Sequence, residues 1–111
     1  MQSDADGCNS PGPAVDLFAE LQAGPEPKWF VTLFGASHLA PYTGGPPWAN
    51  VVARVTTDFF ELELRFRAES FSATTIAAAG DVGGVAAVTT SVSSATMPTV
   101  AANDGCGIPA A

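Results

Sequence analysis

The sequence is poor in positive charge. Its 111 residues include four Lys and Arg against eleven Asp and Glu, which gives a net charge of −7. Binding to nucleic acid or to an anionic membrane surface needs clustered Lys and Arg that neutralise phosphates. The charge balance therefore argues against a nucleic-acid partner and favours uncharged or cationic small molecules as ligands.

Histidine and cysteine are also scarce. The chain has one histidine, His38, and two cysteines, Cys8 and Cys106, with no Cys-x-x-Cys pair. A structural zinc site needs more ligands at a recognisable spacing, so we expect no metal and no other cofactor. The two cysteines are compatible with one disulfide that closes a long loop or with two free thiols. The sequence leaves both states open.

Long apolar runs are absent. None approaches the length that crosses a bilayer, so we expect no membrane span. The residues Met1 to Asp6 lack the basic and apolar segments of a signal peptide, so none is expected, and the localisation stays open. An apolar fraction of 47% in a chain of this length suits one small folded domain.

Two segments carry strong secondary-structure patterns. The run Trp29 to Phe34 is apolar and β-branched without interruption by charge, which is typical of a strand buried on both faces. From about Ala49 to Ser70, apolar residues recur at steps of three and four, which predicts a long amphipathic helix. The members of this stripe are Trp48, Val51, Val52, Val55, Phe59, Leu62 and Phe66. His38 lies in the glycine- and proline-rich loop between the two segments.

The remaining segments have weaker patterns. Residues Ala14 to Gln22 predict a short helix, and a further helix is expected to end near Ala79. Residues 1–13 are expected to hold no regular element, because glycines and prolines interrupt them. Residues 84–111 are rich in Ala, Ser, Thr, Val and Gly, and they predict an irregular tail or weak strands.

The loop that contains the histidine resembles a known family. A buried strand followed by Gly35-Ala36-Ser37-His38 and then Pro41 is similar to the histidine loop of α/β-hydrolases, especially bacterial dienelactone-hydrolase-like and polyester-hydrolase (cutinase-like) ester hydrolases. Upstream, Ser3-Asp4-Ala5-Asp6 followed by Pro11 resembles the loop that carries the acid of these enzymes. The resemblance implies that His38 is the catalytic base and that Asp6 is the acid that orients it.

The resemblance covers about residues 3–83 and implies an α/β fold. Residues 1–83 are then the C-terminal part of an α/β-hydrolase domain, with its last strand, histidine loop and long C-terminal helix, and residues 84–111 are a tail. The implied reaction is hydrolysis of a carboxylic ester, either a small molecule or a polymer. The family's Gly-x-Ser-x-Gly nucleophile is missing from the sequence, so we expect the chain alone to be inactive or nearly so.

Two other functions stay open. One is a non-catalytic interaction module, in which the apolar stripe of the long helix packs against a second copy or against a missing N-terminal half. The other is a small hydrolase with an unconventional nucleophile, namely Ser10, Ser37 or Cys8. The sequence does not distinguish either function from the ester-hydrolase hypothesis.

Several candidate site residues also have purely structural interpretations. The position of Asp6 in the sequence is as typical of a carboxylate that caps a turn as of an acid that orients the histidine. Asp4 is expected to be solvated. The aromatic residues Trp29, Tyr42 and Trp48 could line a substrate cleft, although such residues more often belong to the core.

Overall fold

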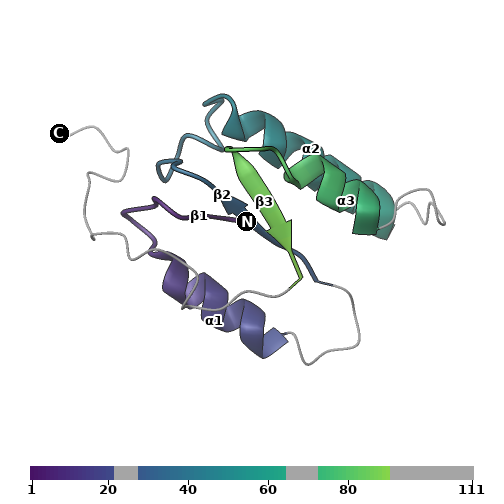
Figure 1. Cartoon of the computed structure of the whole chain (residues 1–111), viewed down its shortest axis with the longest axis horizontal. Coiled ribbons are helices and arrows are strands. Elements are labelled where there is room, and N and C mark those ends of the chain that lie inside the picture. Colours follow the sequence, from purple (N-terminus) through teal and green to yellow (C-terminus); the bar gives the residue numbers. More distant parts are fainter. Residues whose placement is uncertain (22–27, 65–72, 91–111) are drawn as a thin grey trace.

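The computed structural model describes residues 1–21, 28–64 and 73–90. Along the chain, the elements are β1 (Gln2–Ser3), α1 (Pro11–Leu21), β2 (Phe30–Leu33), α2 (Trp48–Leu64), α3 (Ala73–Gly80) and β3 (Ala86–Thr89). The strands form one mixed sheet in the order β1-β2-β3. Helices α2 and α3 lie together on one side of this sheet and α1 lies on the other (Figure 1). The fold is therefore of mixed α/β class, as expected.

Strand β2 runs through the middle of the sheet and is buried along its whole length. Phe30 contacts Val15 and Phe18 of α1, whereas Val31 and Leu33 join the core beneath α2 and α3. Successive side chains of a strand point to opposite faces, so the two helical layers cover both faces of β2. The prediction of a doubly buried strand is confirmed, with shorter bounds than Trp29 to Phe34.

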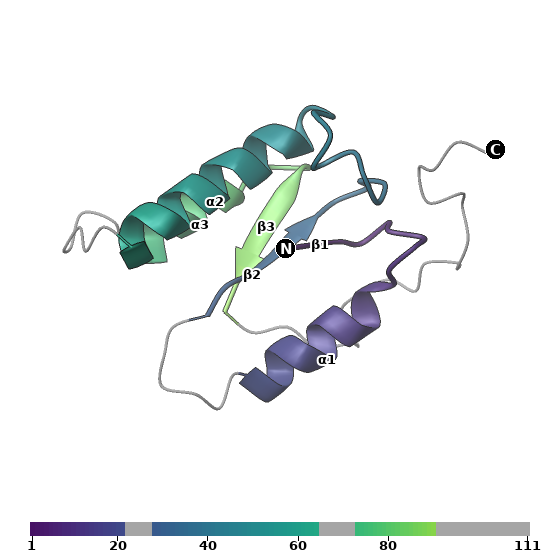
Figure 2. The ribbon, with the colours of Figure 1, turned by 180° about the vertical axis from the view of Figure 1, so that it is seen from behind.

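Helix α2 confirms the long amphipathic helix from Trp48 to Leu64, and residues 65–70 of that prediction lie outside the described residues. Val51 and Val55 are buried in the core. The opposite side of the helix faces solvent (Figure 2), and it carries exposed side chains at Phe60 and Leu64. The apolar side chains of α2 are therefore covered on one side of the helix only.

The expectation that residues 1–13 lack regular structure is wrong. Gln2 and Ser3 pair in parallel with Thr32 and Leu33 of β2, and α1 begins at Pro11. Proline is compatible with the first turn of a helix, because the backbone N–H groups there have no partner within the helix and the proline ring already holds a helical φ.

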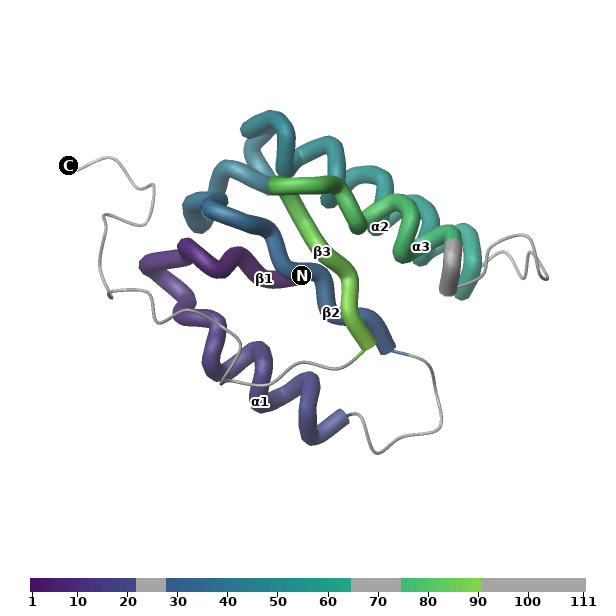
Figure 3. Tube along the Cα trace, in the orientation of Figure 1, coloured from purple at the N-terminus to yellow at the C-terminus, as the bar shows by residue number. Residues whose placement is uncertain are grey.

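The expected last strand is in fact the central one. Strand β3 follows the two helices and pairs antiparallel with β2, from Phe30 opposite Thr89 to Leu33 opposite Ala86. It lies within the stretch that the sequence assigned to the tail, and the chain reaches it directly from α3 (Figure 3). Helix α3 ends at Gly80, one residue beyond the expected end.

Candidate functional site

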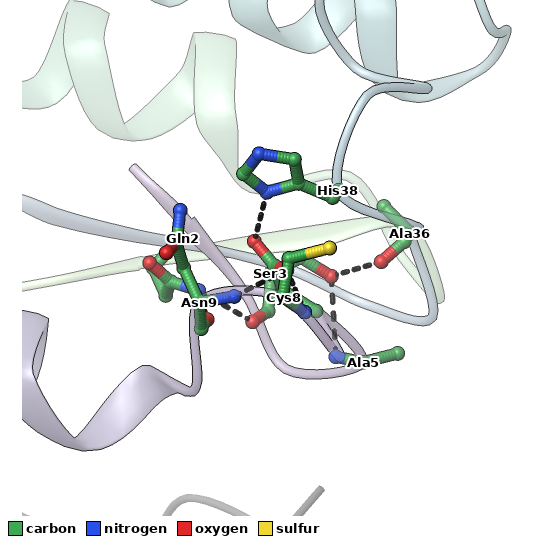
Figure 4. Close-up of polar contacts among 8 residues, drawn as sticks. Gln2, Ser3, Ala5, Cys8, Asn9, Ala36 and His38 are labelled. Carbon is green, nitrogen blue, oxygen red and sulfur yellow. Dashed lines mark hydrogen bonds and ion pairs between the residues drawn. The ribbon is translucent and has the colours of Figure 1, made fainter. Parts of the chain in front are cut away.

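The site lies at the edge of the sheet where β1 and β2 both end. The two strands are parallel, with Ser3 opposite Leu33, so the loops that follow them leave the sheet at the same edge. Asp6 lies in the first of these loops, which we call the acid loop (residues 4–10), and His38 lies in the second. The parallel pairing therefore brings together two residues that are far apart in the sequence. Figure 4 shows His38 together with Cys8 and Asn9 of the acid loop.

Asp6 and His38 form a hydrogen-bonded pair. His38 Nδ1 lies 2.9 Å from Asp6 Oδ2, and the Asp6 side chain is 9% exposed while that of His38 is 30% exposed. The other carboxylate oxygen, Oδ1, accepts hydrogen bonds from the backbone N–H groups of Cys8 and Asn9, each at 2.9 Å. One oxygen of Asp6 thus caps the turn, and the other contacts the imidazole.

The environment of Asp6 favours its ionised form. Burial is the largest single influence on the Asp6 pKa and raises it. The hydrogen bonds from Asn9, His38 and Cys8, together with the charge on a protonated His38, outweigh burial and hold the pKa of Asp6 below its ordinary value of 3.8. Asp6 is consequently a carboxylate at neutral pH and can hold or stabilise a positively charged imidazole.

Two further side chains connect the acid loop to the histidine loop. The Ser3 hydroxyl donates to the carbonyl oxygen of Ala36 and accepts from the N–H of Ala5. Asp4 Oδ1 accepts from the N–H of Gly35 at 2.7 Å, where the chain turns with a φ of +69° that glycine adopts without strain. The expectation that Asp4 is simply solvated is therefore wrong, since its carboxylate fixes the turn that leads to His38.

The three candidate aromatic residues have different roles. Trp48 donates its indole N–H to the carbonyl oxygen of Phe34 at 2.8 Å, which ties α2 to the start of the histidine loop. Trp29 packs edge-to-face against Phe59, with ring centroids 6.3 Å apart, and is a packing residue. Tyr42 is more than half exposed. The pKa of Tyr42 is raised by partial burial and by the negative charge of Asp6. Tyr42 is therefore the aromatic residue that remains available to a ligand at the site.

The unconventional nucleophiles do not pair with the histidine. Ser10 and Ser37 are exposed, and within the described part of the chain neither forms a hydrogen bond with His38. Cys8 is disulfide-bonded, which leaves no thiolate to attack a substrate. The chain's other cysteine, Cys106, lies outside the described residues.

The position of Cys8 beside the Asp6–His38 pair was not predicted from the sequence. One potential metal-binding atom from each of Asp6, Cys8 and His38 lies within 4.8 Å of the others. No ligand-spacing motif reveals this cluster, because Cys8 and His38 are brought together by strand pairing. The one local signal was the Asp-x-Cys spacing of Asp6 and Cys8. A turn capped by Asp6 brings two residues at this spacing close together.

The chain has no match among protein-family models, curated proteins or solved structures. None of the helices in the described residues has the length and apolar character that a membrane span requires.

Proposed function

We propose that Asp6 and His38 are the acid and the base of an ester hydrolase that uses Ser-His-Asp chemistry, as the resemblance to dienelactone-hydrolase-like and cutinase-like enzymes implies. The observation that carries the proposal is the 2.9 Å contact between Asp6 Oδ2 and His38 Nδ1. Its setting adds support, since both residues follow parallel strands that end at one sheet edge, where α/β proteins commonly place their sites.

The pair supplies proton transfer. With Nδ1 held by Asp6, the second ring nitrogen of His38, Nε2, is the atom that takes a proton from the attacking hydroxyl and returns it to the leaving alcohol. The Asp6 carboxylate fixes the orientation of the ring and stabilises the imidazolium that forms. The lowered pKa of Asp6 keeps this carboxylate charged at the pH where such a base operates.

The nucleophile and the donors to the oxyanion come from elsewhere under this proposal. The sequence has no Gly-x-Ser-x-Gly motif, and no serine among the described residues hydrogen-bonds to His38. Removing a single oxyanion donor slows an acyl-transfer enzyme by roughly 10²- to 10³-fold. We therefore expect residues 1–111 alone to hydrolyse 4-nitrophenyl acetate no faster than free imidazole at the same concentration.

A chimaera tests the pair for activity. This chain would replace the acid- and histidine-bearing portion of a cutinase-like esterase that keeps its own serine. We expect the chimaera to hydrolyse the ester, and we expect His38→Ala and Asp6→Ala to abolish the turnover. Asp16→Asn is the matched control, because Asp16 is exposed on α1, and this substitution should change nothing.

Two results would contradict the proposal. The first is a chimaera that keeps full activity after His38→Ala, because the histidine would then have no role. The second is turnover by residues 1–111 alone that disappears in His38→Ala, which would indicate a nucleophile within the chain. Single substitutions of Ser10, Ser37 and Cys8 would identify it.

A second candidate function is self-association through α2. Phe60 and Leu64 are 50% and 67% exposed, and Phe59, which is also exposed, borders an open apolar groove of about 390 Å³. Contiguous exposed apolar side chains are typical of an interaction surface. Light scattering should show a dimer or larger species that Phe60→Ser with Leu64→Ser converts to a monomer. Leu17→Ser, at a residue 58% exposed on α1, is the control, and a wild-type monomer would exclude this function.

A further inference from the structure

The side chain of Cys8 lies next to the Asp6–His38 pair. Potential ligand atoms of the three residues are within 4.8 Å of one another. Asp6 is buried, while Cys8 and His38 are half-buried. Thiolate, imidazole and carboxylate are the three ligand types that zinc takes from proteins.

The geometry is close to that of a zinc site. With metal–ligand distances of about 2.0–2.3 Å, tetrahedral ligand atoms lie about 3.3–3.6 Å apart. The separations of the ligand atoms, none of which exceeds 4.8 Å, therefore have to change by at most about 1.5 Å, and Asp6 Oδ2 has to give up its contact with His38 Nδ1. Asp6 Oδ1 is already held by the N–H groups of Cys8 and Asn9, which leaves Oδ2 to face the metal. Backbone donors of this kind orient ligating carboxylates in metalloproteins.

Access to the cluster is open on the Cys8 side. A pocket of about 410 Å³ is lined by Gln2, Cys8, Asn9, Ser10, Pro13 and Ala14. Solvent, a reductant and a metal ion can reach Cys8 through this pocket.

The disulfide of Cys8 controls whether this ligand exists. A sulfur in a disulfide is not a thiolate and does not bind zinc. A dithiol reductant breaks the S–S bond, gives two electrons and two protons to the two sulfurs, and is itself oxidised to a disulfide. Binding of the metal to the resulting Cys8 thiol then releases its proton to water as the metal–sulfur bond forms.

We propose that reduction of the Cys8 disulfide creates a zinc site from Asp6, Cys8 and His38, with water in the fourth position. The oxidised chain keeps the Asp6–His38 pair, and the reduced, metal-bound chain uses both side chains as ligands. The two states exclude each other, because the pair cannot serve a substrate and hold a metal through the same atoms. The site does not depend on the ester-hydrolase proposal, since its test measures metal binding alone.

Cobalt(II), which adopts zinc-like geometry and absorbs light, is the probe. Thiolate-bound cobalt gives a charge-transfer band in the near ultraviolet, so the band reports the Cys8 ligand directly. We expect wild-type protein to show the band after treatment with a phosphine reductant and not before. Cys106→Ser removes the only other cysteine in the sequence, so this variant should bind cobalt without any reductant.

Variants of the ligands complete the test. Cys8→Ser should abolish the charge-transfer band, and His38→Gln and Asp6→Asn should each weaken cobalt binding by at least about 10-fold. Asp16→Asn is the matched control, because Asp16 is exposed on α1 and lies outside the cluster, and its affinity should equal that of the wild type. Zinc should displace cobalt and remove the band.

Three outcomes would overturn the proposal. They are the absence of a band in both reduced wild type and Cys106→Ser, an equal band in the oxidised protein, and unchanged affinity in His38→Gln. The last would show that cobalt binds a thiol without the cluster. Circular dichroism of Cys106→Ser in the absence of metal shows whether the fold persists without the disulfide. If it does not, and cobalt fails to restore the folded spectrum of the reduced wild type, the proposal is overturned as well, because the reduced chain then does not assemble the cluster.

Discussion

Replacement of Asp6 tests how the acid loop is held. Asp6→Asn keeps an oxygen for the N–H groups of Cys8 and Asn9 but places an amide N–H₂ opposite His38, in place of Oδ2. A hydrogen bond to a charged group contributes about 1.5–3 kcal/mol, so we expect this loss in the free energy of unfolding. Asp6→Ala also removes the turn cap, which contributes about 0.5–2 kcal/mol, and should cost about 2–5 kcal/mol in total.

The effect of Asp6→Asn should depend on pH. The pKa of Asp6 is lowered in the folded state, so the folded protein binds fewer protons than the unfolded chain in the acid range. The stabilisation that ionised Asp6 gives to the folded state is therefore complete above pH 3.8, the pKa of this group in the unfolded chain. It is lost as the pH falls through the lower pKa that Asp6 has in the folded state. A protonated Asp6 resembles asparagine, so the difference between wild type and Asp6→Asn should approach zero in strong acid.

Urea unfolding at several pH values, from about 7 to about 2, measures this difference. Asp16→Asn is the control, since Asp16 is exposed on α1 and its substitution should leave stability within about 0.5 kcal/mol at every pH. An Asp6→Asn variant as stable as the wild type at pH 7 would refute the reasoning. So would a difference that stays constant down to pH 2.

Two further substitutions test the packing around the site. Gly80→Ala should destabilise the protein by about 1–3 kcal/mol in urea unfolding, because the alanine Cβ would lie 2.2 Å from Val88 Cγ2. Gly12→Ala is the control and should be neutral or stabilising, because a Cβ at that position meets nothing within 4 Å. Equal effects of the two would contradict the close approach of α3 and β3. Trp48→Phe should cost about 0.5–1.5 kcal/mol through loss of the hydrogen bond to the Phe34 carbonyl, and unchanged stability would show that this bond contributes nothing.

The parts of the fold that the sequence predicted are those with strong local patterns. The apolar run around Val31 and the helical stripe around Val55 each specify an element by their own periodicity. The Asp6–His38 contact was anticipated from the motifs of the two loops, and the parallel pairing of β1 with β2 provides the physical means.

The parts that the sequence did not predict depend on contacts between distant residues. The two-residue strand at Gln2–Ser3 has no periodicity of its own and exists through its pairing with β2. Strand β3 consists of small residues with a weak pattern, and its position is set by the antiparallel ladder. The bond from Asp4 to Gly35 likewise spans two loops, so no local pattern could reveal it.

The protonation of the His38 ring tests most directly whether Asp6 holds this histidine as a base. Long-range ¹⁵N–¹H correlation spectra distinguish the two ring nitrogens of the neutral imidazole. We predict that Nδ1 carries the proton and donates it to Asp6 Oδ2, that Nε2 is unprotonated, and that Asp6→Asn abolishes this preference. A neutral His38 with its proton on Nε2 would contradict the proposed acid–base pair. So would a ring whose proton stays on the same nitrogen in Asp6→Asn.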